Sequence, residues 1–70
     1  MCTAVIWRFV KNGEEIRYEL RREKLDGPYY LVRVRADGTE TVTEIDQATD
    51  VVEHTAEVMR ALRRDGWTLV

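Results

Sequence analysis

Arginine is the residue type in this chain with the greatest capacity to bind a ligand. The chain has nine arginines and only two lysines. A guanidinium group binds carboxylate or phosphate through two parallel hydrogen bonds, and arginine is common at protein interfaces. Five of the nine lie in segments where apolar and charged residues alternate: Arg8, Arg17, Arg21, Arg33 and Arg35. This pattern predicts an arginine-rich surface on a β-sheet.

Catalytic chemistry has one candidate, His54. Asp50, Glu53 and Glu57 lie near it at helical spacing, and a histidine beside carboxylates can act as a general base. The sequence places no nucleophile next to it. The four glycines are isolated from one another, so the chain has no glycine-rich phosphate loop. We therefore expect a solvated histidine and no enzymatic activity.

The cysteine and histidine content argues against a bound metal or cofactor. Cys2 is the only cysteine and His54 the only histidine, so no intrachain disulfide can form and no pair has the spacing of a metal site. We expect no cofactor. Because small domains without such links depend on good packing or on self-association, we expect a homodimer.

Length and charge restrict the class of protein. Seventy residues with 44% hydrophobic content suffice for one domain, residues 1–70. The net charge of −2 excludes a generally basic nucleic-acid binder. No apolar run approaches the roughly 20 residues of a membrane span, and the N-terminus lacks the pattern of a signal peptide. We expect a cytoplasmic protein without membrane contact.

Two strands joined by a tight turn are predicted at the start of the chain, over about 3–11 and 14–22. Asn12-Gly13 between them is typical of a two-residue hairpin turn. Pairing outward from this turn predicts three pairs on the core face: Phe9 with Ile16, Trp7 with Tyr18, and Val5 with Leu20. The opposite face receives three others: Arg8 with Arg17, Ile6 with Glu19, and Ala4 with Arg21.

Two further strands are predicted over about 29–35 and 39–45. In the third strand we expect three core-facing residues, Tyr30, Val32 and Val34, and three outward-facing ones, Leu31, Arg33 and Arg35. Residues 36–38 have the sequence of a three-residue hairpin loop with glycine in the left-handed position. This loop would pair Val32 with Val42 on the core face.

After residue 45 the apolar spacing becomes that of a helix. Apolar or small residues recur at intervals of three and four, at Val51, Thr55, Val58 and Leu62. This stripe predicts a helix over about 47–65, with Asp50 and Glu53 at the spacing of a capping box. The tail, residues 66–70, either covers the core or adds a short fifth strand beside the first.

These elements predict an α+β fold, in which a four-stranded antiparallel meander carries one C-terminal helix on one face (ββββα). In strand count alone, this order resembles that of the single-stranded-DNA-binding transcriptional coactivators, with no motif in common. The resemblance adds single-stranded nucleic acid to the ligands that the uncovered face could bind.

The uncovered face of this sheet is the candidate binding surface. Its predicted contact residues are Arg8, Arg17, Arg21, Arg33, Arg35, Ile6, Tyr29 and Leu31. In one interpretation, Glu15 and Glu19 neutralise arginines whose stems merely cover a solvated face. In a second, a protein partner or another copy packs on the partly apolar surface. In a third, single-stranded nucleic acid binds the arginines and stacks on Tyr29. Protein binding is our preferred hypothesis, and nucleic-acid binding the alternative.

Overall fold

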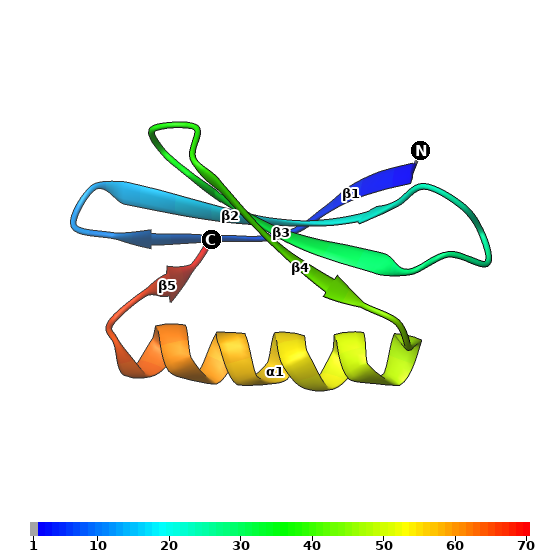
Figure 1. The fold of residues 1–70 in the computed structure, drawn as a ribbon. Helices are drawn as coiled ribbons and strands as arrows, with labels where there is room; N and C mark the ends of the chain where they lie inside the picture. The colour runs from blue at the N-terminus through cyan, green and yellow to red at the C-terminus, as the bar shows by residue number, and fades with distance from the viewer. Residues whose placement is uncertain (1) are drawn as a thin grey trace.

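The protein folds into a five-stranded antiparallel sheet with one helix along one face (Figure 1). The computed structural model describes residues 2–70, apart from the side chains of Cys2 and Val5. The elements are β1 (Cys2–Lys11), β2 (Glu14–Arg22), β3 (Tyr29–Arg35), β4 (Glu40–Ile45), α1 (Ala48–Arg64) and β5 (Thr68–Leu69). The strand order is β4-β3-β2-β1-β5. The predicted α+β fold is confirmed, including the short fifth strand beside the first.

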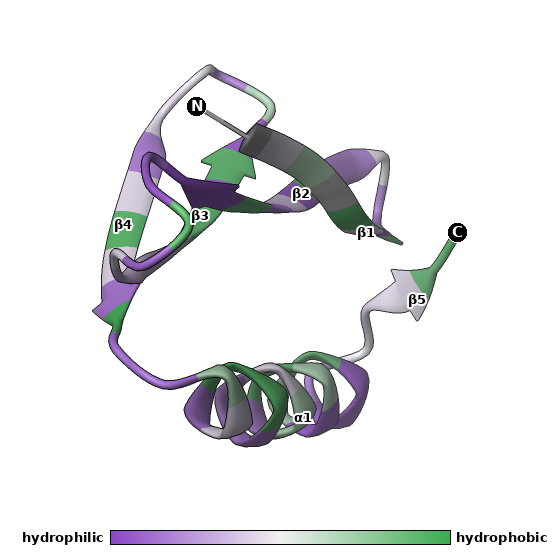
Figure 2. Ribbon diagram, turned by 90° about the vertical axis from the view of Figure 1, so that its right-hand side faces the viewer, coloured by the Kyte–Doolittle hydropathy of each residue, from purple (hydrophilic) through white to green (hydrophobic). Residues whose placement is uncertain are grey.

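The β1–β2 hairpin turns at Asn12 and Gly13. Both residues have positive φ, 50° and 80°, as the twist of a two-residue hairpin requires. The pairs of Phe9 with Ile16 and of Trp7 with Tyr18 form as predicted. Figure 2 shows the sheet curving above α1, with β4 and β5 on its two sides.

A β-bulge at Ile6 overturns the predicted pairing of the first half of β1. The register shifts between Val5 and Trp7, so that Val5 pairs with Glu19 rather than with Leu20. A bulge inserts one extra residue and reverses the alternation beyond it. Ile6, predicted on the uncovered face, consequently packs against the core cluster instead.

The face assignment predicted for β3 is wrong. β3 pairs with β2 so that Arg33 lies opposite Tyr18 and Val32 opposite Glu19. Since opposite residues share a face, Arg33 lies on the helix side and Val32 on the uncovered side. A register change of one residue moves every side chain of a strand to the other face. Apolar alternation alone cannot fix that register, which here depends on the connection over residues 23–28.

The β3–β4 loop has the predicted geometry, but the valine pair beside it lies on the face that was not predicted. The backbone N–H of Arg35 donates to the Thr39 carbonyl at 3.0 Å, and Gly38 takes the left-handed φ of 88°. Val32 pairs with Val42, as predicted, but this valine pair lies on the uncovered side of the sheet.

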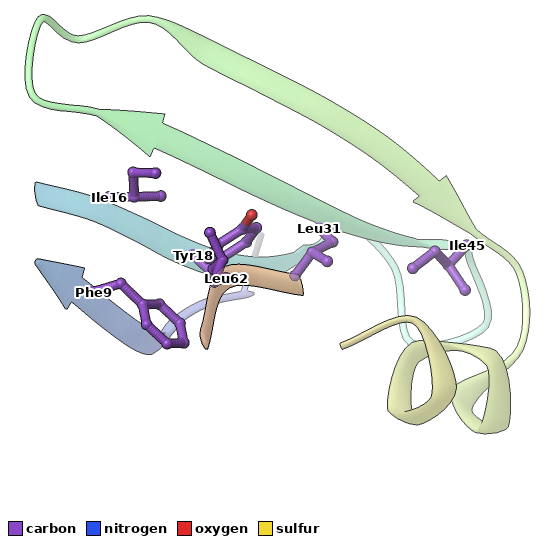
Figure 3. Packing of buried hydrophobic residues seen from close by; sticks show 6 residues of the cluster. All are labelled: Phe9, Ile16, Tyr18, Leu31, Ile45 and Leu62. Atoms are coloured by element: carbon purple, nitrogen blue, oxygen red, sulfur yellow. The ribbon is translucent and has the colours of Figure 1, made fainter. Parts of the chain in front are cut away.

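The core lies between the sheet and α1. Its buried members are Phe9, Ile16, Tyr18, Leu31, Ile45 and Leu62 (Figure 3). Trp7 packs against them from β1, with its ring 5.6 Å from that of Tyr18 in an edge-on arrangement. The partly buried Trp67 packs on the same cluster, and its backbone N–H donates to the Leu62 carbonyl at 2.9 Å. The C-terminal tail therefore both covers the core and adds a strand.

The start of α1 differs from the predicted capping box. Gln47 is the N-cap residue and makes no side-chain capping bond, and Asp50 lies inside the first turn. Asp50 therefore acts on the positive end of the helix dipole as a first-turn carboxylate, not as a cap.

Candidate functional site

We call the sheet surface opposite α1 the outer face. The strand pairings place on it Arg8, Val10, Glu15, Arg17, Glu19, Arg21, Tyr30, Val32, Val34, Glu40, Val42 and Glu44. Among residues 2–70, no helix or strand lies over this face (Figure 1). This face is therefore open to a partner.

Glu19 is the centre of an ion-pair network on the outer face. Its carboxylate accepts a hydrogen bond from Arg17 Nε at 2.8 Å and another from Arg21 at 2.8 Å. Only 7% of Glu19 is exposed. The hydrogen bond from Arg21 is the largest influence on the pKa of Glu19, and together with that from Arg17 it outweighs desolvation and lowers this pKa. Glu19 is thus held as a carboxylate that links two arginines.

Two further ion pairs extend the network to the neighbouring strands. Arg21 reaches Glu40 on β4 at 3.1 Å, and hydrogen bonds to Glu40 and then to Glu19 raise the pKa of Arg21. Arg8 contacts Glu15 at 2.6 Å. Arg8 and Arg17 do lie opposite each other, as predicted, but each has its own carboxylate. Their like-charge repulsion is therefore compensated.

Apolar surface lies beneath and beside these ion pairs. Val32 is only 1% exposed and Val34 only 9%, although no helix or strand of the described residues covers them. Arg17 lies opposite Val34, and Glu19, which binds Arg17 and Arg21, lies opposite Val32, so that the arginine stems can cover both valines. Val42, in contrast, is 56% exposed.

A shallow depression lies on the outer face beside the exposed Val42. It has a volume of about 150 Å³ and is lined by Arg21, Glu23, Tyr30, Val32 and Val42. Tyr30 and the three valines of β3 and β4 were missed as candidate contacts because they were predicted to be core. The alternation of apolar and charged residues in β3 and β4 shows that each strand has two different faces, but it does not show which of them is uncovered.

Four predicted contact residues lie on the helix side rather than on the outer face. Arg33 donates its Nε hydrogen to the Tyr18 hydroxyl at 2.6 Å. Leu31 is part of the core, and Tyr29 lies under the guanidinium of Arg22, whose central carbon is 4.3 Å from the ring centroid. Arg35 lines a groove between β3 and the end of α1. With Ile6 at the bulge, five of the eight predicted contacts leave the outer face, and Arg8, Arg17 and Arg21 stay on it.

The histidine and its acidic neighbours border a hollow between β4 and α1. Asp50, Glu53, His54 and Glu57 line it from the helix, opposite residues 43–46. Within residues 2–70, no three His, Cys, Asp or Glu side chains are placed to hold a metal ion. Over the same residues, no helix is long and apolar enough to cross a membrane.

Comparison of the chain with protein-family models, with curated proteins and with solved structures found no match. The functional argument therefore depends on the geometry of the sheet.

Proposed function

We propose that this chain is a small non-enzymatic interaction domain that binds a second copy of itself through the outer face of the sheet. The observation that carries the proposal is the orientation of β3, whose valines lie on the face opposite to the one that the sequence predicted. This strand turns Val32 and Val34 toward the uncovered face, beside the exposed Val42. Val32 and Val34 are themselves buried, at 1% and 9% exposure, so the apolar surface that reaches solvent is that of Val42 and Val10, 56% and 36% exposed. Exposed apolar side chains on an uncovered sheet face are typical of an interaction site.

The charge distribution supports a second copy as the partner. The ion pairs of the outer face join three arginines to three glutamates, so the network has no net charge. Glu44 is the one further charged residue that the strand pairings place on the face, so two such faces can approach without strong electrostatic repulsion. The combination of an apolar patch with arginine-containing ion pairs around it is also typical of protein interfaces.

The same network weighs against nucleic acid as the ligand. A phosphate would have to compete with Glu15, Glu19 and Glu40, which neutralise Arg8, Arg17 and Arg21. Arg33 and Arg35, expected to bind phosphate, and Tyr29, expected to stack on bases, lie on the helix side. Protein binding is therefore the better supported of the two functions.

Sedimentation velocity with two matched valine substitutions tests the proposal. Val42→Glu places a charge on the outer face, whereas Val52→Glu places it on an exposed part of α1, where Val52 is 67% exposed. We expect the parent and Val52→Glu to be dimers at about 200 micromolar, a concentration at which even weak association is populated. Val42→Glu should be a monomer with an unchanged circular dichroism spectrum. A monomeric parent, or a dimeric Val42→Glu, would overturn the proposal.

A further inference from the structure

Among residues 2–70, the strand β4 has a hydrogen-bonded neighbour on one side only. It pairs with β3 only and ends the sheet order β4-β3-β2-β1-β5. Figure 2 shows it on one side of the sheet, away from β5. A free strand edge presents unpaired N–H and C=O groups to which another extended chain can add.

The loop before β4 determines which backbone groups point outward. The N–H of Arg35 bonds to the carbonyl of Thr39, and hydrogen-bonded pairs alternate along an antiparallel ladder. Thr41 and Thr43 therefore bond to β3. The backbone groups of the residues between and beside them point to the open side: Glu40, Val42 and Glu44. The side chains of these three lie on the outer face.

Negative charge surrounds this free edge. Glu40 has Arg21 as its counterion, whereas no arginine or lysine of the described residues lies within 4 Å of the Glu44 carboxylate. The hollow beside the end of β4, about 390 Å³, is lined by five acidic residues, Glu44, Asp46, Asp50, Glu53 and Glu57, and by His54, and by no lysine or arginine. Desolvation, and then the charges of Glu44, Glu23 and Asp46, raise the pKa of Tyr30. The whole chain carries a net charge of only −2, so negative charge is concentrated here.

The same charges disfavour pairing of β4 with a second copy of itself. Antiparallel pairing of two copies centred on Val42 would form two glutamate pairs, each with Glu40 of one copy opposite Glu44 of the other. A shift of two residues would set Val42 opposite a glutamate. Like charges directly opposite each other destabilise a strand pair, so the edge selects a chain of different composition.

We propose that the free edge of β4 binds an extended basic segment of another protein by strand addition. The segment would carry lysine or arginine opposite Glu40 and Glu44 and an apolar residue opposite Val42. Further basic residues would follow where it passes Asp46 and the acidic side of α1. This site uses the backbone edge of β4, whereas the proposed dimer uses the side chains of the outer face; Val42 contributes to both, through its outward N–H here and through its side chain there.

A synthetic peptide provides the probe, with two arginines followed by the core sequence Lys-Thr-Val-Thr-Lys, so that antiparallel pairing with β4 sets the arginines beside Asp46. Titrated into the ¹⁵N-labelled protein, it should shift amide signals of residues 40–46 and slow hydrogen exchange at Val42 by about tenfold, because that amide gains a partner. A peptide with glutamate in place of each basic residue should cause no change. Shifts centred elsewhere, or none at about 1 mM peptide, the weak limit of specific binding, would overturn the proposal.

Substitutions on the protein separate backbone pairing from charge. Val42→Pro removes an outward N–H but no bond to β3 and should abolish binding, whereas Val42→Ala keeps that N–H and should retain it. Glu44→Lys should weaken binding about tenfold or more, and Glu14→Lys, on the distant hairpin, by less than about twofold. Should Val42→Pro unfold, Glu44→Lys and the exchange rate still decide the outcome. Slower hydrogen exchange of the Val42 amide at higher protein concentration without peptide would identify a second copy paired along this edge and overturn the proposal, whereas dimerisation through the outer face would leave that amide unpaired.

Discussion

Arg33 and Tyr18 face each other across β2 and β3, joined by a hydrogen bond of 2.6 Å from Nε to the phenol oxygen. The central carbon of the guanidinium lies 5.3 Å from the centroid of the tyrosine ring. A charged side chain is thereby accommodated on the helix-covered face of the sheet. The pair explains how β3 can turn its valines toward the open side without leaving a cation unpartnered in the core.

The coupling between these two residues is measurable by a double-mutant cycle. Tyr18→Phe should cost about 1 kcal/mol, the usual net contribution of one hydrogen bond. Arg33→Met should remove the same bond, and the double variant should show a coupling energy of about 0.5 to 1.5 kcal/mol. Urea denaturation of the four proteins gives the values. Strict additivity would mean that the bond contributes nothing to stability.

Phe9 and Val10 are adjacent residues with opposite environments. Phe9 is 0% exposed and Val10 is 36% exposed. Phe9→Ala should therefore lower the free energy of unfolding by about 3 to 5 kcal/mol, comparable with the whole stability of a small domain. Val10→Ala should cost less than about 1 kcal/mol. Thermal melting monitored by circular dichroism distinguishes them, and similar midpoints would place Phe9 outside the core.

The sequence predicted those features of the fold that short segments determine. The turn at Asn12-Gly13 and the loop over residues 36–38 depend on local backbone preferences, and the helix depends on one apolar stripe. Strand boundaries and strand order could be derived from these signals, since each strand follows its neighbour along the chain.

The faces of the strands could not be predicted because they depend on register. Ile6 occupies a bulge that apolar alternation does not reveal. On β3, Val-Arg-Val-Arg is compatible with either face, and the connection that decides is held by Arg22, whose Nε donates to the Gly27 carbonyl at 3.2 Å. The predicted binding surface depended on this register. In the structure, Arg33 and Arg35 therefore lie on the face opposite to the one that was predicted.

Glu19→Gln tests the ion-pair network. The amide keeps the shape of the side chain but leaves Arg17 and Arg21 without their shared negative charge. We expect a loss of about 1.5 to 3 kcal/mol, the range for hydrogen bonds to charged groups. Glu14→Gln, at an exposed position with no ion pair to any described residue, should change stability by less than about 0.5 kcal/mol. Equal effects in chemical denaturation would show that the network is not stabilising.

Binding to single-stranded nucleic acid should be undetectable. The outer-face arginines are paired with glutamates, so we expect no change in the anisotropy of a labelled oligonucleotide at 100 micromolar protein and about 50 mM salt. Saturable binding that weakens with salt, with a slope of roughly 0.7 per phosphate contact, would instead support the nucleic-acid alternative. Loss of that binding in Arg17→Ala would locate it on the outer face.

The lowered pKa of Glu19 makes a prediction about pH. A carboxyl group whose pKa is lower in the folded state than in the unfolded state stabilises the fold when ionised. This stabilisation is fully present above the unfolded pKa, about 4.3 for glutamate, and is lost as pH falls through the lower, folded value. The free energies of unfolding of the parent and of Glu19→Gln should therefore differ most near neutral pH and converge below about pH 4. Urea denaturation of both proteins at several pH values gives this difference, and a difference that does not change with pH would show that the charge of Glu19 is not what stabilises the network.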